Sequence, residues 1–191
     1  GQGYEAEVAL EGQFAGLEVR GRADGYLPAR NCLEEIKTHR GDLASQPDNH
    51  RQLHWAQARV YGWLMCQQRG LQAINLALVY LDVDSEQETR FECSASAAEL
   101  EAYFQEQCQR FLHWAETQAR RLVLRDAGLG ALGFPWPSFR QGQRELAETV
   151  YKAVSTGRCL MAQATTGIGK TLGTLFPQLK AMPRQPLDKV L

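Results

Sequence analysis

The stretch from Arg20 to Arg40 constrains the fold of this chain most, because it predicts two strands joined by a tight turn. Residues 17–20 alternate apolar and polar side chains, as a half-buried strand does, and the short segment 33–37 is bounded by turn residues. A turn centred between Ala29 and Arg30 sets the register of the antiparallel pair. Residue 28 then faces residue 31 and, by the same sum, residue 24 faces residue 35.

This register brings Asp24, Glu35 and Lys37 to one face of the expected sheet. Two facing carboxylates repel each other unless a positive charge lies between them, and a hard cation such as Mg²⁺ binds oxygen ligands of this kind. The Lys37 ammonium is then placed to orient a water molecule or a developing oxyanion. The alternative interpretation is a surface hairpin whose charges form exposed salt bridges of little energetic weight.

The composition is typical of a globular chain and excludes several classes of protein. Of the 191 residues, 44% are hydrophobic and 23% charged, no apolar run approaches membrane-spanning length, and we expect a cytoplasmic protein with no membrane partner. The net charge of −1 means that nucleic-acid binding needs a local basic patch, which we expect between residues 37 and 59. The five cysteines are scattered without a CxxC pair, which argues against a disulfide framework and against a zinc or iron–sulfur site.

A helix is expected from Asp48 to Arg69, and it carries two stripes. The apolar stripe consists of Leu53, Ala56, Val60 and Leu64. The polar stripe beside it consists of His50, His54, Gln57 and Tyr61. We expect the polar stripe to meet the active edge of the sheet and to contact substrate phosphates; alternatively, Gln57 and Tyr61 only make hydrogen bonds at the edge of the core. His50 and His54 have the spacing of metal ligands, but no third ligand accompanies them.

The remaining pattern up to residue 127 predicts one compact α/β domain. Residues 4–11 form a first strand and 12–16 a turn, whereas 72–84 are apolar on both faces like a central strand and 86–93 return beside it. Ser96 and Glu99 have the spacing of a capping box, which opens a long amphipathic helix through about Arg125. Residues 128–138 are rich in glycine and proline and are expected to be a linker.

A different pattern follows the linker, in residues 139–191. A helix over 139–155 and a short buried strand over 158–163 lead into the loop Ala164–Thr171, with the sequence ATTGIGKT, and then into another helix. This order is the context of a phosphate-binding P-loop. Its glycines let backbone N–H groups approach phosphate, Lys170 reaches the β- and γ-phosphates, and Thr171 can hold Mg²⁺.

Residues 1–127 resemble a RecB-like nuclease of the PD-(D/E)XK superfamily. The matching pieces are Gly21–Asp24, Glu35–Lys37, and Gln57 with Tyr61 in a Q-x-x-x-Y pattern. The resemblance implies a mixed central sheet flanked by helices, and an Asp24 and Glu35 pair that holds one or two Mg²⁺ or Mn²⁺ ions. It also implies phosphodiester hydrolysis assisted by Lys37, and support of the site or DNA contact by Gln57 and Tyr61. Such nucleases usually carry a further histidine or glutamate on a helix before the first strand, and we expect this ligand to be missing here.

Residues 139–191 are similar to the opening of a superfamily-two DNA helicase of the DinG/XPD kind. The segment 139–143 resembles the adenine-reading Q-motif, and 164–171 has the A-x-T-G-x-G-K-T form of the P-loop. The resemblance implies an ATP and Mg²⁺ site made by Phe139, Arg140, Gln143, Thr166, Gly167, Gly169, Lys170 and Thr171. A carboxylate that helps hold Mg²⁺ and a group that positions water are not visible, so ATPase activity of these residues alone is not expected.

The function that the sequence favours is a metal-dependent DNA nuclease fused to the start of an ATP-dependent DNA helicase, acting in DNA repair or processing on single-stranded or branched DNA. In this hypothesis Asp24 and Glu35 ligate the metal, the Ile36 carbonyl adds a ligand, and Lys37 orients the attacking water. Two alternatives stay open. One is a nuclease-like fold retained as a DNA-binding or docking module, and the other is a nucleotide-binding regulatory protein led by the P-loop.

Overall fold

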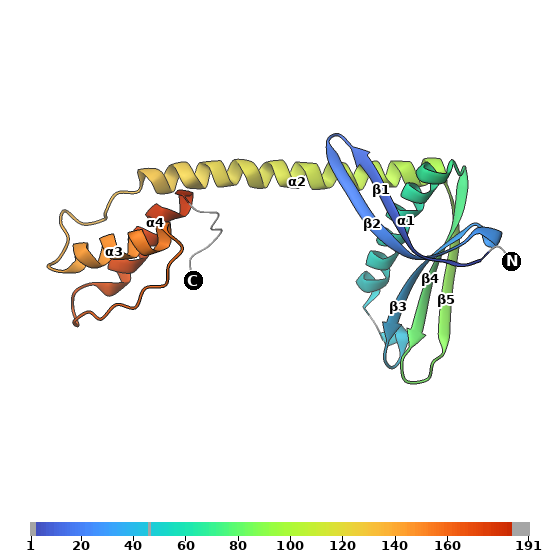
Figure 1. The fold of residues 1–191 in the computed structure, drawn as a ribbon, viewed down its shortest axis with the longest axis horizontal. Helices are drawn as coiled ribbons and strands as arrows, with labels where there is room; N and C mark the ends of the chain where they lie inside the picture. Colours follow the sequence, from blue (N-terminus) through green and yellow to red (C-terminus); the bar gives the residue numbers. More distant parts are fainter. Residues whose placement is uncertain (1–2, 46, 185–191) are drawn as a thin grey trace. The chain divides into compact units, whose positions relative to one another are not determined.

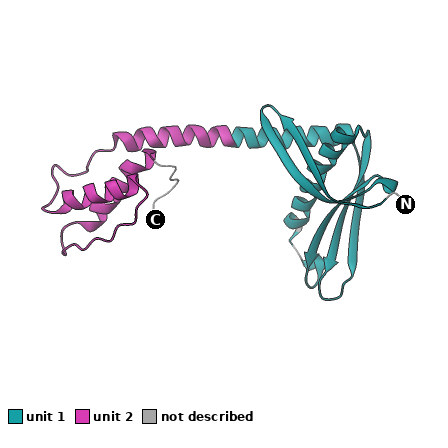
Figure 2. Ribbon diagram, viewed as in Figure 1, with its two compact units in different colours: residues 1–114 teal, residues 115–191 magenta. Residues whose placement is uncertain are grey.

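A computed structural model of the chain describes residues 3–45 and 47–184. The chain divides into two compact units, residues 1–114 and residues 115–191, which are coloured separately in Figure 2. The division lies within helix α2 (Ala97–Ala131). Within the described residues, no helix is both long enough and apolar enough to cross a bilayer.

The first unit is built on a five-stranded mixed sheet with the spatial order β1-β2-β3-β4-β5 (Figure 1). Its elements, in chain order, are β1 (Glu5–Phe14), β2 (Leu17–Leu27), β3 (Cys32–His39), α1 (Asp48–Arg69), β4 (Ala73–Asp82), β5 (Glu88–Ser96) and the start of α2. Strands β3 and β4 are parallel, and the other neighbours are antiparallel. Since parallel neighbours need a crossover connection, α1 makes that connection. The expected order of three strands, a helix, two strands and a helix is confirmed.

Two of the three hairpins of the sheet, β1–β2 and β2–β3, have short turns that fix their register. Between β2 and β3, a single 3₁₀ turn at Pro28–Arg30 ends at Asn31, whose φ is 45°. Leu27 then pairs with Cys32 and Gly25 with Glu34, which is the register expected from the sequence. Between β1 and β2, the turn is shorter than the expected 12–16, because Gly12 and Gln13 still pair with β2 and only residues 15 and 16 turn. Both turn residues have positive φ, as the type I′ turn of a two-residue hairpin requires.

The main core lies where α1 and the start of α2 pack against the sheet. Leu33, Leu64 and Leu76 are fully buried in this core, with Leu100 and Phe104 of α2 nearly so. The capping box that begins α2 is confirmed, because the Glu99 carboxylate accepts the backbone N–H of Ser96 at 2.8 Å and the Ser96 hydroxyl accepts the N–H of Glu99 at 3.3 Å.

The second unit contains the end of α2 and two further helices, α3 (Gln143–Ser155) and α4 (Lys170–Ala181). Helix α2 extends to Ala131, so residues 128–131 of the expected linker are helical. The Gly130 carbonyl near the end of this helix accepts a hydrogen bond from Lys180 of α4. Helix α3 begins four residues later than expected, because Gly142 at its N-cap has a left-handed φ of 75°.

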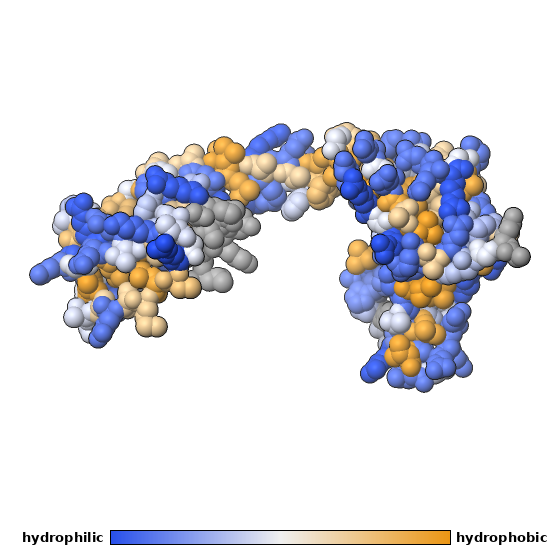
Figure 3. Space-filling view, viewed as in Figure 1, coloured by the Kyte–Doolittle hydropathy of each residue, from blue (hydrophilic) through white to orange (hydrophobic). Residues whose placement is uncertain are grey.

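The buried strand expected over residues 158–163 does not form. The described part of the second unit contains no strand that could pair with it, and the side chain of Met161 is 99% exposed. A lone extended segment satisfies none of its backbone groups through a sheet ladder, so an apolar sequence alone does not make it a strand. Large apolar or aromatic side chains are also exposed along α2; they are Phe111, Trp114, Leu122, Val123 and Leu124. Figure 3 shows orange, hydrophobic patches on the surface of this helix.

Candidate active site

Asp24 of β2 lies at the point where the pairing of β2 with β3 ends. The next pair of this register would be Asp24 with Glu35, but the backbone pairing stops before it. At this point a side-chain hydrogen bond of Asp24 replaces the backbone hydrogen bonds between the strands. Its Oδ2 atom accepts the backbone N–H of Ile36 at 2.7 Å. The Lys37 ammonium donates to Oε1 of Glu35, so the structure brings together the three charged side chains singled out in the sequence.

Glu35 is the most unusual member of this group, because its side chain is fully buried. Burial raises the pKa of the Glu35 carboxyl, the Lys37 ammonium opposes this rise, and the negative charge of Asp24 adds to it. The Oε2 atom is buried and has no hydrogen-bond partner among the described residues. A buried carboxylate oxygen without a partner is costly, so an additional ligand for Oε2 would stabilise the ionised form.

The neighbouring Glu34 points to the opposite face of the sheet, as alternation along a strand requires. There it forms an ion pair with Arg90 of β5 at 2.5 Å, and Arg90 also pairs with Glu92. Sequence alone offers two adjacent glutamates, and this pairing leaves Glu35 as the one on which the charges of Asp24 and Lys37 act.

Helix α1 brings His54 over the same face of the sheet. Its Nδ1 atom lies 2.8 Å from the hydroxyl of Tyr80, and Tyr80 is the residue of β4 that pairs with Lys37. Burial lowers the pKa of His54, and the positive charges of Lys37 and His50 lower it further. The sequence predicts that His54 belongs to a polar stripe, but it does not indicate Tyr80 as the partner, because Tyr80 belongs to a strand that is apolar on both faces.

Tyr61 of α1 packs directly on β2 at Gly21. A Cβ atom at position 21 would lie 2.4 Å from Cε1 and 2.6 Å from the hydroxyl oxygen of Tyr61, so only glycine leaves room for this ring. Gln57, one turn earlier on α1, is half-buried. The Q-x-x-x-Y pattern thus joins α1 to the strand that carries Asp24.

The donor set suits a hard divalent cation, although it is small. Asp24 and Glu35 supply carboxylate oxygens, and one of these is the buried unpartnered Oε2 atom of Glu35. Among the described residues, no cluster of three or more His, Cys, Asp and Glu side chains could hold a metal ion, so His50 and His54 do not gain a third ligand. All five cysteines are free thiols.

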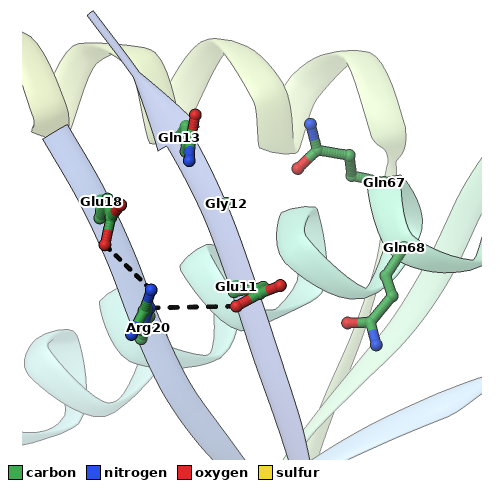
Figure 4. A pocket seen from close by; sticks show the side chains of 7 residues that line it. All are labelled: Glu11, Gly12, Gln13, Glu18, Arg20, Gln67 and Gln68. Carbon is green, nitrogen blue, oxygen red and sulfur yellow. Dashed lines mark ion pairs between the residues drawn. The ribbon is translucent and has the colours of Figure 1, made fainter. Parts of the chain in front are cut away.

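A cavity of the first unit lies away from these carboxylates. It has a volume of about 550 Å³ and lies between the β1–β2 hairpin and the end of α1 (Figure 4). Figure 4 shows Arg20 between Glu11 and Glu18, with ion-pair distances of 3.9 and 3.0 Å. These charged groups are exposed and form ion pairs with one another.

In the second unit, the loop before α4 has the backbone that its glycines permit. Gly167 and Gly169 have φ of 85° and 82°, and α4 begins at Lys170. The Lys170 ammonium donates to the carbonyl oxygens of Ala164 and Thr165 at 3.2 and 2.9 Å, so it lies inside the loop. Thr166 and Thr171 are exposed.

The segment 139–143, which resembles a Q-motif, donates side-chain hydrogen bonds to this loop. Gln143 is only 3% exposed and donates to the Gly169 carbonyl at 3.0 Å, while Arg140 donates to the Gly167 carbonyl at 2.8 Å. Phe139 stacks on Phe134 with ring centroids 3.8 Å apart. A cavity of about 310 Å³ adjoins the loop and is lined by Trp136, Ser138, Arg140, Gln143, Gly169 and Leu172.

Comparisons with known proteins are partial. No family model matches the chain. A stretch of 46 residues, 24% of this chain, is 41% identical to a protein of Methanocaldococcus jannaschii named "Probable ATP-dependent helicase MJ0942", and it spans only 7% of that relative's length. The crystal structure of a "Putative exonuclease" from Eubacterium rectale overlaps 63% of this chain and 44% of its own, with 17% identity and a TM-score of 0.38. The crystal structure of SSO0001 overlaps 52% of this chain and 46% of its own, with 24% identity and a TM-score of 0.35.

Proposed function

We propose that the first unit is a metal-dependent DNA nuclease that hydrolyses phosphodiester bonds at Asp24, Glu35 and Lys37. The observation that carries this proposal is the buried Oε2 atom of Glu35, which lacks a partner among the described residues while Asp24 and Lys37 lie beside the same carboxyl. A purely structural glutamate in this position would be expected to have both oxygens satisfied. A cation shared with Asp24 supplies the missing interaction.

Each residue has a distinct role in this proposal. Asp24 and Glu35 hold Mg²⁺ or Mn²⁺, with the Ile36 carbonyl as an added ligand, and the bound ion supplies Lewis acidity toward a phosphodiester. Lys37 keeps Glu35 ionised and donates a hydrogen bond to the attacking water or to a phosphate oxygen. The Asp24 side chain is held in place by the Ile36 N–H, so one of its oxygens is oriented before any ligand binds.

Two arginines of α1 support the choice of DNA as the substrate, and each lies over an aromatic ring of a neighbouring element. Arg51 lies over the ring of Phe91 and Arg59 over the ring of Tyr103, at 4.8 and 5.4 Å from the ring centroids. These guanidinium groups can neutralise backbone phosphates of single-stranded or branched DNA. Gln57 and Tyr61 support the same face of the site.

The second unit is proposed to bind ATP with Mg²⁺ and to belong to the helicase part of a longer protein. Support comes from the loop around Lys170, from its hydrogen bonds with Arg140 and Gln143, and from the cavity beside it. In this proposal Thr171 holds Mg²⁺ and the cavity holds the base. The name of the Methanocaldococcus relative agrees with a helicase role.

The nuclease proposal is tested by incubating the full chain with labelled single-stranded DNA and Mn²⁺. We expect cleavage by the parent chain and a loss of at least about 100-fold in Asp24→Ala and Lys37→Ala, because each removes a group that acts in the transition state. Glu18→Ala is the matched control, since Glu18 is an exposed carboxylate on the same strand as Asp24. Cleavage by Lys37→Ala at the parent rate would remove Lys37 from the mechanism.

The small donor set favours one second candidate, a nuclease-like fold that binds DNA without cleaving it. Calorimetric titration with Mn²⁺ separates the two. The nuclease proposal expects Mn²⁺ binding by the parent and by Glu18→Ala, and none by Asp24→Ala. DNA binding without Mn²⁺ binding in the parent would establish the second candidate instead.

A further inference from the structure

The contact between His54 and Tyr80 has no role in the proposed hydrolysis, although Tyr80 of β4 pairs with Lys37 of β3. Tyr80 is 1% exposed, and its ring is fixed by Phe91 and His39, with ring centroids at 6.0 and 6.3 Å. The hydroxyl of this immobile ring lies 2.8 Å from Nδ1 of His54. The imidazole is therefore held by a rigid partner inside the protein.

The direction of this hydrogen bond determines which nitrogen of His54 remains available. The positive charge of Arg51 acts on the phenol of Tyr80, and this charge favours an arrangement in which the hydroxyl proton points away from Arg51 toward Nδ1. With Nδ1 accepting, the neutral ring carries its proton on Nε2, and the charged ring carries one there as well. In either state Nε2 is a donor, and no described residue accepts its hydrogen bond.

The position of His54 places this donor beside the proposed reaction site. Tyr80 and Lys37 are paired across the β3–β4 ladder, and α1 packs on both of these strands (Figure 1). The positive charge of Lys37 also lowers the pKa of His54. A ligand that accepts a hydrogen bond from Nε2 thus lies near the Lys37 ammonium. Because this ammonium is positively charged, we expect the ligand to be an anion.

We propose that His54 is a substrate-positioning residue, whose Nε2–H donates a hydrogen bond to a non-bridging phosphate oxygen of the DNA strand held beside Lys37. Tyr80 acts through His54, because it fixes the orientation of the ring. This inference rests on the proposed nuclease function and assigns the phosphate contact to a residue outside the charged triplet. The proposal gives a role to the Nε2 donor of His54, which packing against Tyr80 alone does not require.

Two substitutions of His54 test the roles of its two ring nitrogens separately. In His54→Asn the side-chain amide can replace Nδ1 and keep the contact with Tyr80, but nothing reaches the position of Nε2. In His54→Gln the amide reaches the position of Nε2 and loses the contact with Tyr80. DNA binding is measured by fluorescence anisotropy of a labelled oligothymidylate in Ca²⁺, and turnover is measured as kcat/KM in Mn²⁺.

We expect His54→Asn to weaken oligothymidylate binding and kcat/KM by about tenfold, the effect of one hydrogen bond to a charged group. His54→Gln is expected to stay within about threefold of the parent, since it keeps the donor. Mn²⁺ binding should be unchanged in both variants, which shows that the metal site is intact. Equal losses in the two variants, or a larger loss in His54→Gln, would overturn the inference and leave His54 as a packing partner of Tyr80.

The same experiment distinguishes failure of the inference from failure of the nuclease proposal. Cleavage by the parent and by His54→Asn at equal rates refutes the role of His54 alone. Absence of both DNA binding and cleavage in the parent refutes the nuclease function, and the role of His54 falls with it.

Discussion

Replacing Gly21 by alanine should destabilise the first unit through one identified clash. The new Cβ atom would lie 2.4, 2.6 and 2.7 Å from the Cε1, hydroxyl oxygen and Cζ atoms of Tyr61. Carbon atoms in favourable contact are about 3.5–4.0 Å apart, so the ring has to move by roughly an ångström. Insertion of an extra methyl group into a packed site costs about 1–3 kcal/mol.

The sign of this effect should reverse when the ring is removed. In a Tyr61→Ala background the clash is absent, and alanine within a strand is more favourable than glycine by about 0.5–1 kcal/mol because it restricts the unfolded chain. The free energy of unfolding should therefore fall on Gly21→Ala in the parent and rise in Tyr61→Ala. The coupling between the two sites amounts to roughly 1.5–4 kcal/mol.

Hydrogen exchange followed by mass spectrometry is the suitable assay, because the two units of the chain need not unfold together. Peptides from β2 and β3 report the free energy of opening of the first unit in the parent, the two single variants and the double variant. Gly3→Ala is the control, since a Cβ atom there meets nothing within 4 Å. Equal costs of Gly21→Ala with and without the Tyr61 ring would refute the proposed clash.

Three further outcomes are expected. Glu35→Gln should stabilise the first unit by about 1 kcal/mol at neutral pH, because burial raises the folded-state pKa of Glu35 and its ionised form is costly. The gain should shrink as pH falls through this raised pKa and vanish below the ordinary carboxyl pKa, so a pH-independent gain in urea unfolding would contradict the assignment. Ser96→Ala should cost about 1 kcal/mol by removing the cap of α2, seen as faster amide exchange in its first turn; unchanged exchange would argue against the capping box. Lys170→Ala should weaken the binding of a fluorescent ATP analogue by more than about tenfold, whereas Lys152→Ala on the exposed surface of α3 should not, and equal binding by both would argue against an ATP site at this loop.

The local arrangement of the first unit was predictable because its signals are local. Strand alternation and the tight turn at Pro28–Arg30 set the pairing of β2 with β3, and the register of two strands needs no information from elsewhere in the chain. The capping box at Ser96 likewise depends on groups three residues apart. The end of α2 was less predictable, since Gly128 and Gly130 lower helix propensity without preventing a helix.

The segment 158–163 marks the limit of this kind of prediction. Its apolar sequence is compatible with a buried strand, but a strand forms only where neighbours accept its backbone hydrogen bonds, and the described residues of the second unit supply none. The contact between His54 and Tyr80 likewise depends on tertiary structure that no local sequence pattern indicates. Its two residues are 26 positions apart, and only the crossover of α1 from β3 to β4 brings them together.

The sequence by itself thus determined the order of elements in the first unit and the register of the central hairpin, and it predicted that Asp24, Glu35 and Lys37 lie close together. Only the tertiary structure decided that Glu35 is fully buried with one oxygen unpartnered, and that His54 is anchored by Tyr80. Periodicity along a chain fixes which side chains share a face, whereas burial and hydrogen bonding depend on what the rest of the molecule packs against that face.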